Sequence, residues 1–326
     1  MSREFTACAA FALDGGRIIV DMDQPHRTTL GTFTLLLSAI IWGFAFVAQR
    51  AGMQYVGPFT FNGLRFALGT LILLPWLIVS RGRSYNRMSA VPHRRVRIGL
   101  ALAGVVLFVS ANLQQLGLVE TTAGKAGFIT GLYVVIVPLL GLLRGHAIRG
   151  WVWAGCAVSV VGLYLLSVVG VLSLSPGDAW VLAGAFGWAV HVHVVEWLVR
   201  RARPVVIAVT QFATCAVLSL IVAVLTESIR MQAILSAGWT IAYAGVLSVG
   251  VAYTLQVVGQ RHVEPARAGI ILSLESVFAV LGGWWILGET LSLRGAVGCA
   301  LMLAGMVMAQ RGAGASADAP AGRASS

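Results

Sequence analysis

The sequence predicts an all-α membrane protein in which ten transmembrane helices form two inverted five-helix repeats. Three observations support this fold class: an apolar composition, ten apolar stretches of membrane-spanning length, and a one-sided distribution of positive charge. Of the 326 residues, 58% are hydrophobic and 11% are charged. Because soluble domains carry about 25% charged residues, most of the surface of this chain must face lipid rather than water.

The apolar stretches are each about 20 residues long, the length that a helix needs to cross a hydrocarbon core of ~30 Å. We expect the spans at roughly 30–49, 59–79, 98–118, 123–143, 150–170, 178–198, 205–225, 238–258, 266–287 and 293–310. No long polar stretch separates them, so no soluble domain is expected between them. The first repeat is predicted at 30–170 and the second at 178–310.

The two ends of the chain differ from the spans in composition. Residues 1–29 are polar and show no apolar core followed by a small-residue cleavage site, so we expect no signal peptide. We expect a disordered N-terminal tail there, in which residues 1–21 either belong to the protein or reflect an over-extended start. Residues 311–326 are of low complexity and are expected to form a disordered C-terminal tail.

Positive charge is concentrated on one side of the predicted membrane. If the N-terminus is cytoplasmic, 18 of the 23 Lys and Arg residues fall in cytoplasmic segments and Arg65 falls within a span. The outer segments hold only Arg50, Lys125, Arg230 and Arg294. This positive-inside bias predicts a multi-pass protein of the cytoplasmic (inner) membrane with both termini in the cytoplasm. It also accounts for the net charge of +11 without a nucleic-acid partner. The basic stretch 81–97 is open to contact with anionic lipid headgroups, although a purely topogenic role is favoured.

The two halves of the chain match each other at an offset of 142 to 146 residues. The stretches 125–145 and 267–288 align with one gap, and GCAVSVVG (155–162) aligns with GCALMLAG (298–305). Because the repeated unit has five spans, an odd number, the second copy enters the membrane from the opposite side. Inverted repeats of this kind are an architecture of secondary transporters.

Five stretches carry a resemblance to a known family. They are WGFAFVAQ, FNGLRFALGTLILL, AGFITGLYVVIVPLL, ILSLESVFAVLGGWWILGE and GCALMLAGMVMAQ, in spans 1, 2, 4, 9 and 10. In their order and duplication they resemble the EamA family of the drug/metabolite transporter superfamily, from about residue 34 to 310. One departure concerns the Gly-Glu pair that closes spans 4 and 9 in that family: Gly288-Glu289 is present, but its partner here is Gly145-His146.

The resemblance implies a secondary carrier that exports or exchanges small metabolites, amino acids among them, by alternating access between the two repeats. It further implies a central cavity lined mainly by spans 1, 3, 4, 6, 8 and 9. Protons are a candidate coupling ion. The alternatives are a flippase for a lipid-linked or bulky substrate and a membrane scaffold that transports nothing.

Glu275 is the main candidate for the substrate cavity or for coupling. It lies ten residues after Pro265, near the middle of its span, where a charge costs at least ~2.5–3.5 kcal/mol on insertion scales. A carboxylate at that depth either faces a wet cavity and binds a cationic group or a proton, or is held by hydrogen bonds as a structural acid. Its repeat mate is Tyr133, at the matching depth of span 4.

Four further candidates lie in the first, second and sixth spans. Trp42 shares a helix face with Ser38 and Gln49, and Trp188 is its approximate repeat mate; both are candidates for cavity walls or for plain packing. His191 is a candidate proton relay or a neutral, hydrogen-bonded histidine. Arg65 either binds an anion, holds the repeat interface or extends toward the membrane surface.

Spans 3 and 8 carry related polar clusters near their ends. Asn112 and Gln115 in one, and Tyr253 and Gln256 in the other, are each spaced i, i+3. They are candidates for gate residues or for interhelical hydrogen bonds. Pro138 removes one backbone hydrogen bond in span 4 and leaves the Val134 carbonyl without its helical donor.

The sequence shows none of the patterns that would indicate an enzyme. We find no Ser/His/Asp grouping, no HExxH, no nucleotide-binding GxxxxGK[ST] and no paired carboxylates. The four cysteines form no CxxC or metal-ligand spacing and are expected to be small packing residues. We therefore expect no enzyme activity, no cofactor and no metal, with a small-molecule substrate and membrane lipids as the partners.

Overall fold

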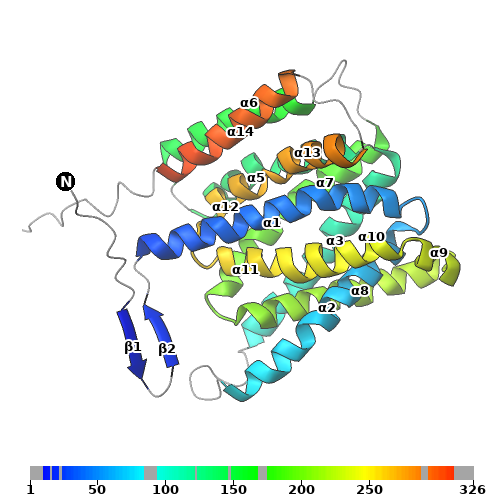
Figure 1. Ribbon diagram of the computed structural model, residues 1–326, viewed down its shortest axis with the longest axis horizontal. Helices are drawn as coiled ribbons and strands as arrows, with labels where there is room; N and C mark the ends of the chain where they lie inside the picture. Colours follow the sequence, from blue (N-terminus) through cyan, green and yellow to red (C-terminus); the bar gives the residue numbers. More distant parts are fainter. Residues whose placement is uncertain are drawn as a thin grey trace, which may run out of the picture.

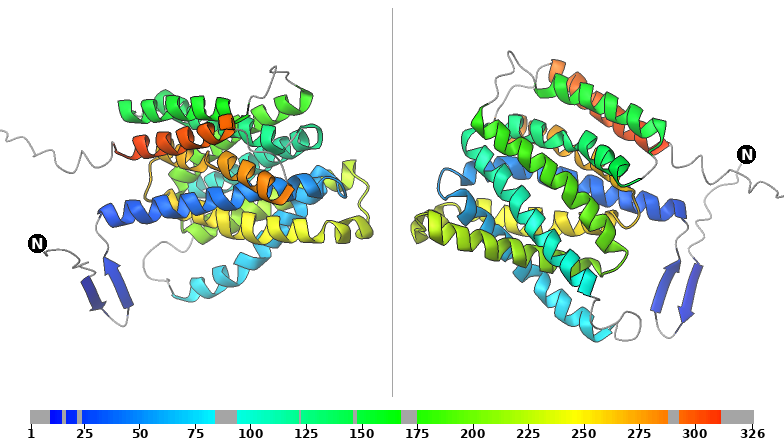
Figure 2. Two further views of the ribbon diagram at one scale, coloured as in Figure 1. Left: turned by 45° about the horizontal axis from the view of Figure 1, so that its top comes forward. Right: turned by 180° about the vertical axis from the view of Figure 1, so that it is seen from behind.

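The computed structural model describes residues 10–14, 17–21, 24–83, 94–121, 123–145, 148–167, 175–287 and 293–311. In chain order the elements are β1 (Ala10–Asp14), β2 (Arg17–Asp21), α1 (Gln24–Gly52), α2 (Pro58–Arg83), α3 (Arg94–Glu120), α4 (Ala123–Gly131), α5 (Tyr133–Leu143), α6 (Gly150–Ser167), α7 (Pro176–Val199), α8 (Pro204–Thr226), α9 (Met231–Ser236), α10 (Gly238–Tyr243), the π-helix η1 (Ala244–Tyr253), α11 (Thr254–Gly259), α12 (Pro265–Leu272), α13 (Glu275–Leu287) and α14 (Leu293–Arg311). Figures 1 and 2 show these helices gathered into one bundle.

Proline marks the start of four of these helices. α2, α7, α8 and α12 begin at Pro58, Pro176, Pro204 and Pro265. Proline suits the first turn because its fixed φ matches the helix and its missing N–H would have no helical acceptor there. Pro58 and Pro204 are repeat mates, so α2 and α8 begin at equivalent points of the two repeats.

The outer surface of the bundle is apolar and its interior holds polar groups. Trp76, Ile78 and Leu225 are each more than 60% exposed, whereas Arg65 and Glu275 are at most 5% exposed. Among the described residues, seven helical segments are long and apolar enough to cross a membrane, and three shorter apolar helices lie at the predicted spans 4, 5 and 10. The prediction of a multi-span helical membrane protein is confirmed. Ten as the number of membrane crossings stays a prediction.

The packing of the helices follows the repeat. α2 packs against its repeat mate α8, and α6 packs against its mate α14; the latter pair forms one edge of the bundle in Figure 1. α3 runs along α7, and the equivalent contact of the other repeat joins α1 to α10, η1 and α11. In the same way α1 packs against α12 and α13, while α7 packs against α4 and α5. Each of these helix contacts therefore either joins two repeat mates or has an equivalent contact between the mates of its two helices.

Glycines at equivalent positions allow the closest of these approaches. A Cβ on Gly31 would lie 3.0 Å from the Gly259 carbonyl oxygen, and a Cβ on Gly177 would lie 3.0 Å from that of Gly117. Gly31 and Gly177 are repeat mates, as are Gly117 and Gly259. Small residues let helix backbones approach in lipid, where dispersion contacts drive association. The helix pairs α1–α11 and α3–α7 are therefore packed through equivalent glycine contacts.

Three predicted spans are interrupted, where the sequence predicts continuous helices. Span 4 divides at Leu132 into α4 and α5, and span 9 divides at Ser273 and Leu274 into α12 and α13. Tighter backbone hydrogen bonds of the i→i+3 type replace the regular ladder there, such as Val135 N–H to the Leu132 carbonyl at 3.0 Å. Span 8 contains the π-helix η1, whose wider turn is rare and often found at functional sites.

Two short strands precede the first helix. β1 and β2 form an antiparallel pair with Ala10 opposite Asp21, and α1 begins at Gln24 rather than near residue 30. Residues 84–93 of the basic stretch, His146, Gly288, Glu289 and the tail after Arg311 lie outside the described residues.

Candidate functional site

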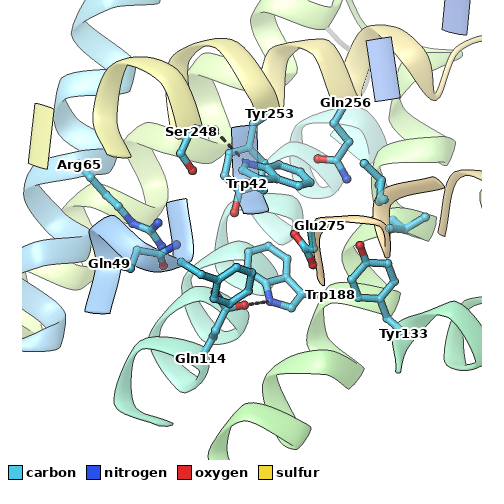
Figure 3. Close-up of a pocket in the computed structure, with 13 residues that line it drawn as sticks. Trp42, Gln49, Arg65, Gln114, Tyr133, Trp188, Ser248, Tyr253, Gln256 and Glu275 are labelled. Carbon is cyan, nitrogen blue, oxygen red and sulfur yellow. Dashed lines mark hydrogen bonds between the residues drawn. The ribbon is translucent and has the colours of Figure 1, made fainter. Parts of the chain in front are cut away.

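A cavity lies inside the bundle, between helices of both repeats. Its lining residues are Trp42, Phe46, Gln49, Arg65, Gln114, Tyr133, Trp188, Val192, Ser248, Tyr253, Gln256, Leu272 and Glu275. Seven of the nine candidates from the sequence line it, namely Glu275, Tyr133, Trp42, Trp188, Arg65, Tyr253 and Gln256. These residues come from segments more than 200 positions apart in the chain, and Figure 3 shows their side chains turned toward one space.

The lining of the cavity repeats the internal symmetry of the chain. Four pairs of lining residues are repeat mates at the offset of 142 to 146: Trp42 with Trp188, Phe46 with Val192, Gln114 with Gln256, and Tyr133 with Glu275. Residues related by the repeat face each other only near the axis that relates the two copies. The cavity therefore lies at the repeat interface, the usual position of a substrate site in transporters with inverted repeats.

Three aromatic rings form the wall of the cavity. The ring centroids of Trp42 and Tyr253 are 4.6 Å apart in an edge-to-face arrangement, and those of Trp188 and Tyr253 are 6.0 Å apart. The indole N–H of Trp42 donates to the Ser248 carbonyl in η1 at 3.1 Å, and that of Trp188 donates to Gln114 Oε1 in α3 at 2.8 Å. Each tryptophan is thus held by the helix beside it, which orients both rings before any ligand enters.

Glu275 and Tyr133 stand at the first positions of two half-helices. α13 begins at Glu275 and α5 begins at Tyr133, directly after the interruptions of spans 9 and 4. Figure 3 shows the Tyr133 hydroxyl directed toward the Glu275 carboxylate across the repeat interface. No Lys, Arg or His forms an ion pair with Glu275 in the part of the chain that the structure describes. The carboxylate is therefore open to a cationic group or a proton.

Arg65 brings a positive charge to the other side of the aromatic wall. Its Nε donates to Asn62 Oδ1 at 2.8 Å, and its guanidinium lies 4.9 Å from the ring centroid of Phe66. Asn62 is itself anchored, since its amide donates to Asn112 Oδ1 at 3.0 Å. Figure 3 shows the terminal guanidinium nitrogens next to Gln49 at the cavity. Among the described residues no carboxylate pairs with Arg65, which leaves these nitrogens able to bind an anionic group.

Two sequence candidates are not among the residues that line the cavity. His191 is fully buried against α8, where its Nε2 lies 2.8 Å from Gln211 Oε1. Gln115 is also fully buried, and its neighbour Gln114 lines the cavity instead. One residue along a helix turns the side chain by about 100°. The repeat offset of 142 pairs Gln256 with Gln114, so the alignment of the two halves already contained the signal for this residue.

Several other sequence candidates have structural partners. Asn112 donates to Ser219 Oγ at 2.9 Å and belongs to the network that holds Arg65. Pro138 leaves the Val134 carbonyl without its helical donor, and this carbonyl accepts a hydrogen bond from the Cys156 thiol at 3.3 Å. Its hydrogen-bond partner therefore lies away from the cavity. Glu196, which is not one of these candidates, forms an i, i+4 ion pair with Arg200 at 3.1 Å. In the described residues no group of three or more His, Cys, Asp or Glu side chains is placed to hold a metal ion.

Comparison with known proteins places this architecture in a family. The profile of the EamA-like transporter family matches the chain twice, over residues 29–168 and 175–310. The chain belongs to the EamA-like transporter family. The two matches coincide with the two repeats, which confirms the internal duplication read from the sequence and the multi-pass membrane character of the protein.

Individual relatives agree with this assignment. An Archaeoglobus fulgidus protein named as an uncharacterized transporter is 30% identical over 275 residues, which cover 84% of this chain and 83% of the relative. The uncharacterized inner membrane transporter YedA of Escherichia coli K12 is 28% identical over 261 residues, 78% of this chain and 81% of YedA. A solved crystal structure covers 91% of this chain with a TM-score of 0.71 and 21% identity, and the match spans 100% of that chain, so the two share their fold. This EamA-like chain is a transporter.

Proposed function

We propose that this EamA-like protein is a secondary exporter of small zwitterionic metabolites, amino acids or related compounds, across the cytoplasmic membrane. It works by alternating access between the two repeats, with both termini in the cytoplasm. One observation carries the substrate class: a single cavity holds one carboxylate, Glu275, and one guanidinium, Arg65, and neither forms an ion pair within the described residues.

The separation of the two charges supports a solute that carries both signs. In Figure 3 the aromatic wall lies between Arg65 and Gln49 on one side and Glu275 and Tyr133 on the other. A substrate carboxylate fits the guanidinium, a substrate ammonium fits Glu275, and an apolar or aromatic part fits against Trp42 and Trp188. The mostly apolar, aromatic lining with a few polar and charged groups is typical of a small-molecule site.

Repeat-related contacts near the two ends of the bundle support alternating access. The Arg50 guanidinium of α1 donates to the Leu118 carbonyl of α3 at 2.6 Å. In the other repeat, Gln260 after α11 donates to the Val192 carbonyl of α7 at 3.3 Å. These contacts join α1 to α3 and α11 to α7, which are equivalent helix pairs. Opening one while the other stays closed would expose the cavity to one side at a time.

The test is counterflow transport in proteoliposomes with a panel of amino acids and their carboxamides, which keep the ammonium but lack the carboxylate. For the parent, the amino acid should be preferred. Arg65→Gln should raise the KM of the amino acid by roughly 10–100-fold, the value of one charge-assisted contact, and should leave the carboxamide nearly unchanged. Arg144→Gln, which removes an exposed charge away from the cavity, is the matched control.

Export itself is tested by comparing the external metabolites of deleted and overexpressing cells. A zwitterion should accumulate outside the overexpressing cells in proportion to the protein. If Arg65→Gln changes amino acid and carboxamide transport equally, the zwitterion assignment is wrong. If the panel contains no substrate and only a lipid-linked compound moves, the protein is a flippase instead.

A further inference from the structure

A second polar surface lies at the end of α3 and α7, apart from the cavity. We propose that Arg94, Arg95 and Arg201, together with Trp197, bind the phosphate headgroup of an anionic phospholipid. Arg94, Arg95, Val96, Trp197 and Arg201 line one open groove. This arginine groove is independent of the transported substrate, and its assignment does not depend on the proposed function.

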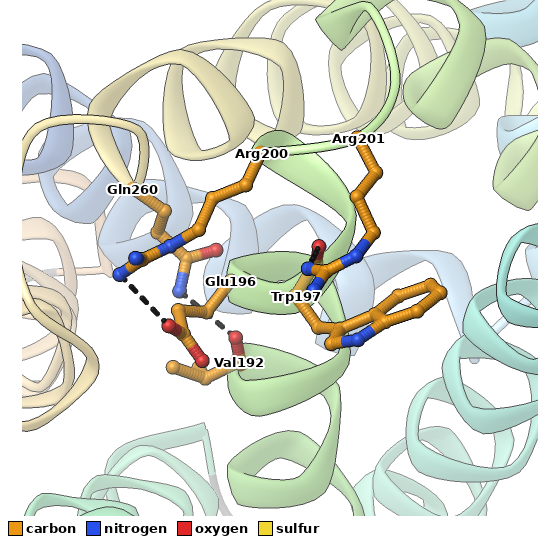
Figure 4. A network of polar contacts seen from close by, with 6 residues as sticks. All are labelled: Val192, Glu196, Trp197, Arg200, Arg201 and Gln260. Carbon is orange, nitrogen blue, oxygen red and sulfur yellow. Dashed lines mark hydrogen bonds and ion pairs between the residues drawn. The ribbon is translucent and has the colours of Figure 1, made fainter. Parts of the chain in front are cut away.

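The charge of the arginine groove is not neutralised by protein groups that line it. All three of its arginines are exposed, and no carboxylate is among the lining residues. The nearby Glu196 pairs with Arg200 instead, and Figure 4 shows that ion pair on a different side of α7 from Arg201. Convergent guanidinium groups match the oxygens of a phosphate, which they bind through paired hydrogen bonds.

Arg201 and Trp197 are held in place before any ligand binds. The Arg201 guanidinium lies 4.4 Å from the centroid of the Trp197 ring, and its Nη1 donates to the Trp197 carbonyl at 2.7 Å. Trp197 in turn packs against α3, where a Cβ on Gly99 would lie 2.6 Å from its Cζ3 atom. A stacked and hydrogen-bonded arginine loses less conformational entropy on binding than a free one.

An apolar stripe next to the arginine groove favours a lipid over a soluble phosphate. Ile98, Leu102, Val105 and Val109 follow Arg94 at spacings of three and four residues, so they share its helix face. They are 56%, 48%, 43% and 42% exposed. A headgroup at the arginines would therefore place an acyl chain along this stripe of α3, in contact with apolar side chains over about three turns.

The arginine groove has no counterpart at the position related to it by the repeat. The repeat mates of Arg94, Arg95, Trp197 and Arg201 are Ser236, Ala237, Ala51 and Tyr55, and none of them is charged. The positive-inside bias requires arginines on one membrane face, but it does not require three of them to line one groove beside a tryptophan. A ligand with concentrated negative charge at that face, as anionic headgroups supply, accounts for three arginines along one groove.

The test is native mass spectrometry of the full-length protein in a nonionic detergent, titrated with dioleoyl phosphatidylglycerol. Phosphatidylcholine serves as the neutral comparison and glycerol phosphate as the same chemistry without acyl chains. The parent should retain one phosphatidylglycerol, and Arg94→Gln/Arg95→Gln/Arg201→Gln should bind it at least about tenfold more weakly. Arg144→Gln/Arg230→Gln/Arg294→Gln removes the same charge elsewhere and should bind like the parent.

A second variant keeps the topogenic charge. Arg94→Lys/Arg95→Lys/Arg201→Lys retains three positive groups but loses the paired hydrogen bonds and the stacked ring contact, so its phosphatidylglycerol affinity should fall below that of the parent. The assignment is overturned if this lysine variant or the glutamine variant binds like the parent, if the control weakens equally, or if phosphatidylcholine binds equally well. Saturation by glycerol phosphate at the affinity of the lipid would identify a free phosphate site and overturn the lipid assignment.

Discussion

At the scale of single residues, the cavity combines a symmetric wall with asymmetric charge. Trp42 and Trp188 are repeat mates, as are Gln114 and Gln256, whereas the mates of Glu275 and Arg65 are the neutral Tyr133 and Gln211. Each charge therefore occurs once. A charge inside a membrane is costly unless it meets a partner or water, so both positions stay candidates for a role that requires the charge.

Glu275→Gln tests that role directly. Glutamine keeps the shape and most of the hydrogen bonds but removes the charge that can take up a proton. Membrane abundance should be unchanged or slightly higher, because a costly buried charge is gone. Transport should fall sharply or lose its dependence on pH, since the remaining amide does not titrate. The measurement is uptake into proteoliposomes over a pH series, normalised to inserted protein.

If Glu275 has only a structural role, the opposite result is expected for transport. In that case Glu275→Gln would transport like the parent at every pH, and only Glu275→Leu would destabilise the protein. Such a result would show that the carboxylate serves packing rather than substrate binding or coupling.

Asn62→Ala tests how Arg65 is held. The substitution removes the acceptor of Arg65 Nε and the donor to Asn112 Oδ1, in a fully buried position. Leaving a buried donor without its partner costs about 1–3 kcal/mol, so the thermal midpoint in detergent should drop and substrate affinity should weaken with it. Ser236→Ala removes only an exposed hydroxyl on α9 and should change neither quantity. Equal midpoints for the two variants would contradict the network.

At the scale of helices, close packing in this protein depends on glycine. α6 and α14 approach so closely that a Cβ on Gly162 would lie 2.6 Å from the Gly298 carbonyl oxygen, and a Cβ on Gly305 would lie 2.6 Å from that of Gly155. The four glycines form two pairs of repeat mates. Because both obstacles are backbone atoms, no side-chain movement can relieve them, and the helices would have to separate.

Gly162→Ala should therefore destabilise the protein by about 1–3 kcal/mol, the cost of overpacking a closed interface. Gly305→Ala should have a similar effect, since it makes the equivalent contact from the other helix. Gly238→Ala is the control, because a Cβ there meets no atom within 4 Å. Thermal unfolding in detergent measures all three. A Gly162→Ala midpoint equal to that of Gly238→Ala would show that α6 and α14 separate without cost.

At the scale of the whole molecule, the inverted repeat and the charge bias together predict an orientation. The basic stretch 81–97 follows the second span, while its repeat mate at 226–237 holds only Arg230, offset by Glu227. In the structure the Glu227 carboxylate accepts hydrogen bonds from the backbone N–H groups of Phe59 and Thr60 at the start of α2. The two equivalent loops thus differ strongly in charge, as expected if they lie on opposite sides of the membrane.

Orientation is tested by a reporter fused after Ser326 and by single cysteines, in a cysteine-free background, at Arg87 and Gln232. We expect the C-terminal reporter and position 87 to report the cytoplasm, and position 232 to react with a membrane-impermeant thiol reagent from outside. A periplasmic C-terminus would contradict both the orientation and the even number of crossings.

Local patterns in the sequence were sufficient to predict the fold class and most of the candidate residues that line the cavity. Apolar stretches of membrane length, the one-sided arginines and the offset of 142 to 146 residues need no knowledge of tertiary packing. The offset also paired Tyr133 with Glu275 and Trp42 with Trp188, and the structure places both pairs around one cavity. These signals are readable because lipid imposes helix length and composition on the chain directly.

Tertiary structure alone decided which face each polar helix position presents. His191 turns to Gln211 rather than to the cavity, because the rotation of a helix about its axis is set by its neighbours. The interruptions before Tyr133 and Glu275, and the π-helix that offers the Ser248 carbonyl to Trp42, likewise arise from packing against α1 and α7 rather than from helix propensity. Hydrophobic length determines that a helix crosses a membrane, but its rotation and local distortion depend on contacts made far away in the sequence.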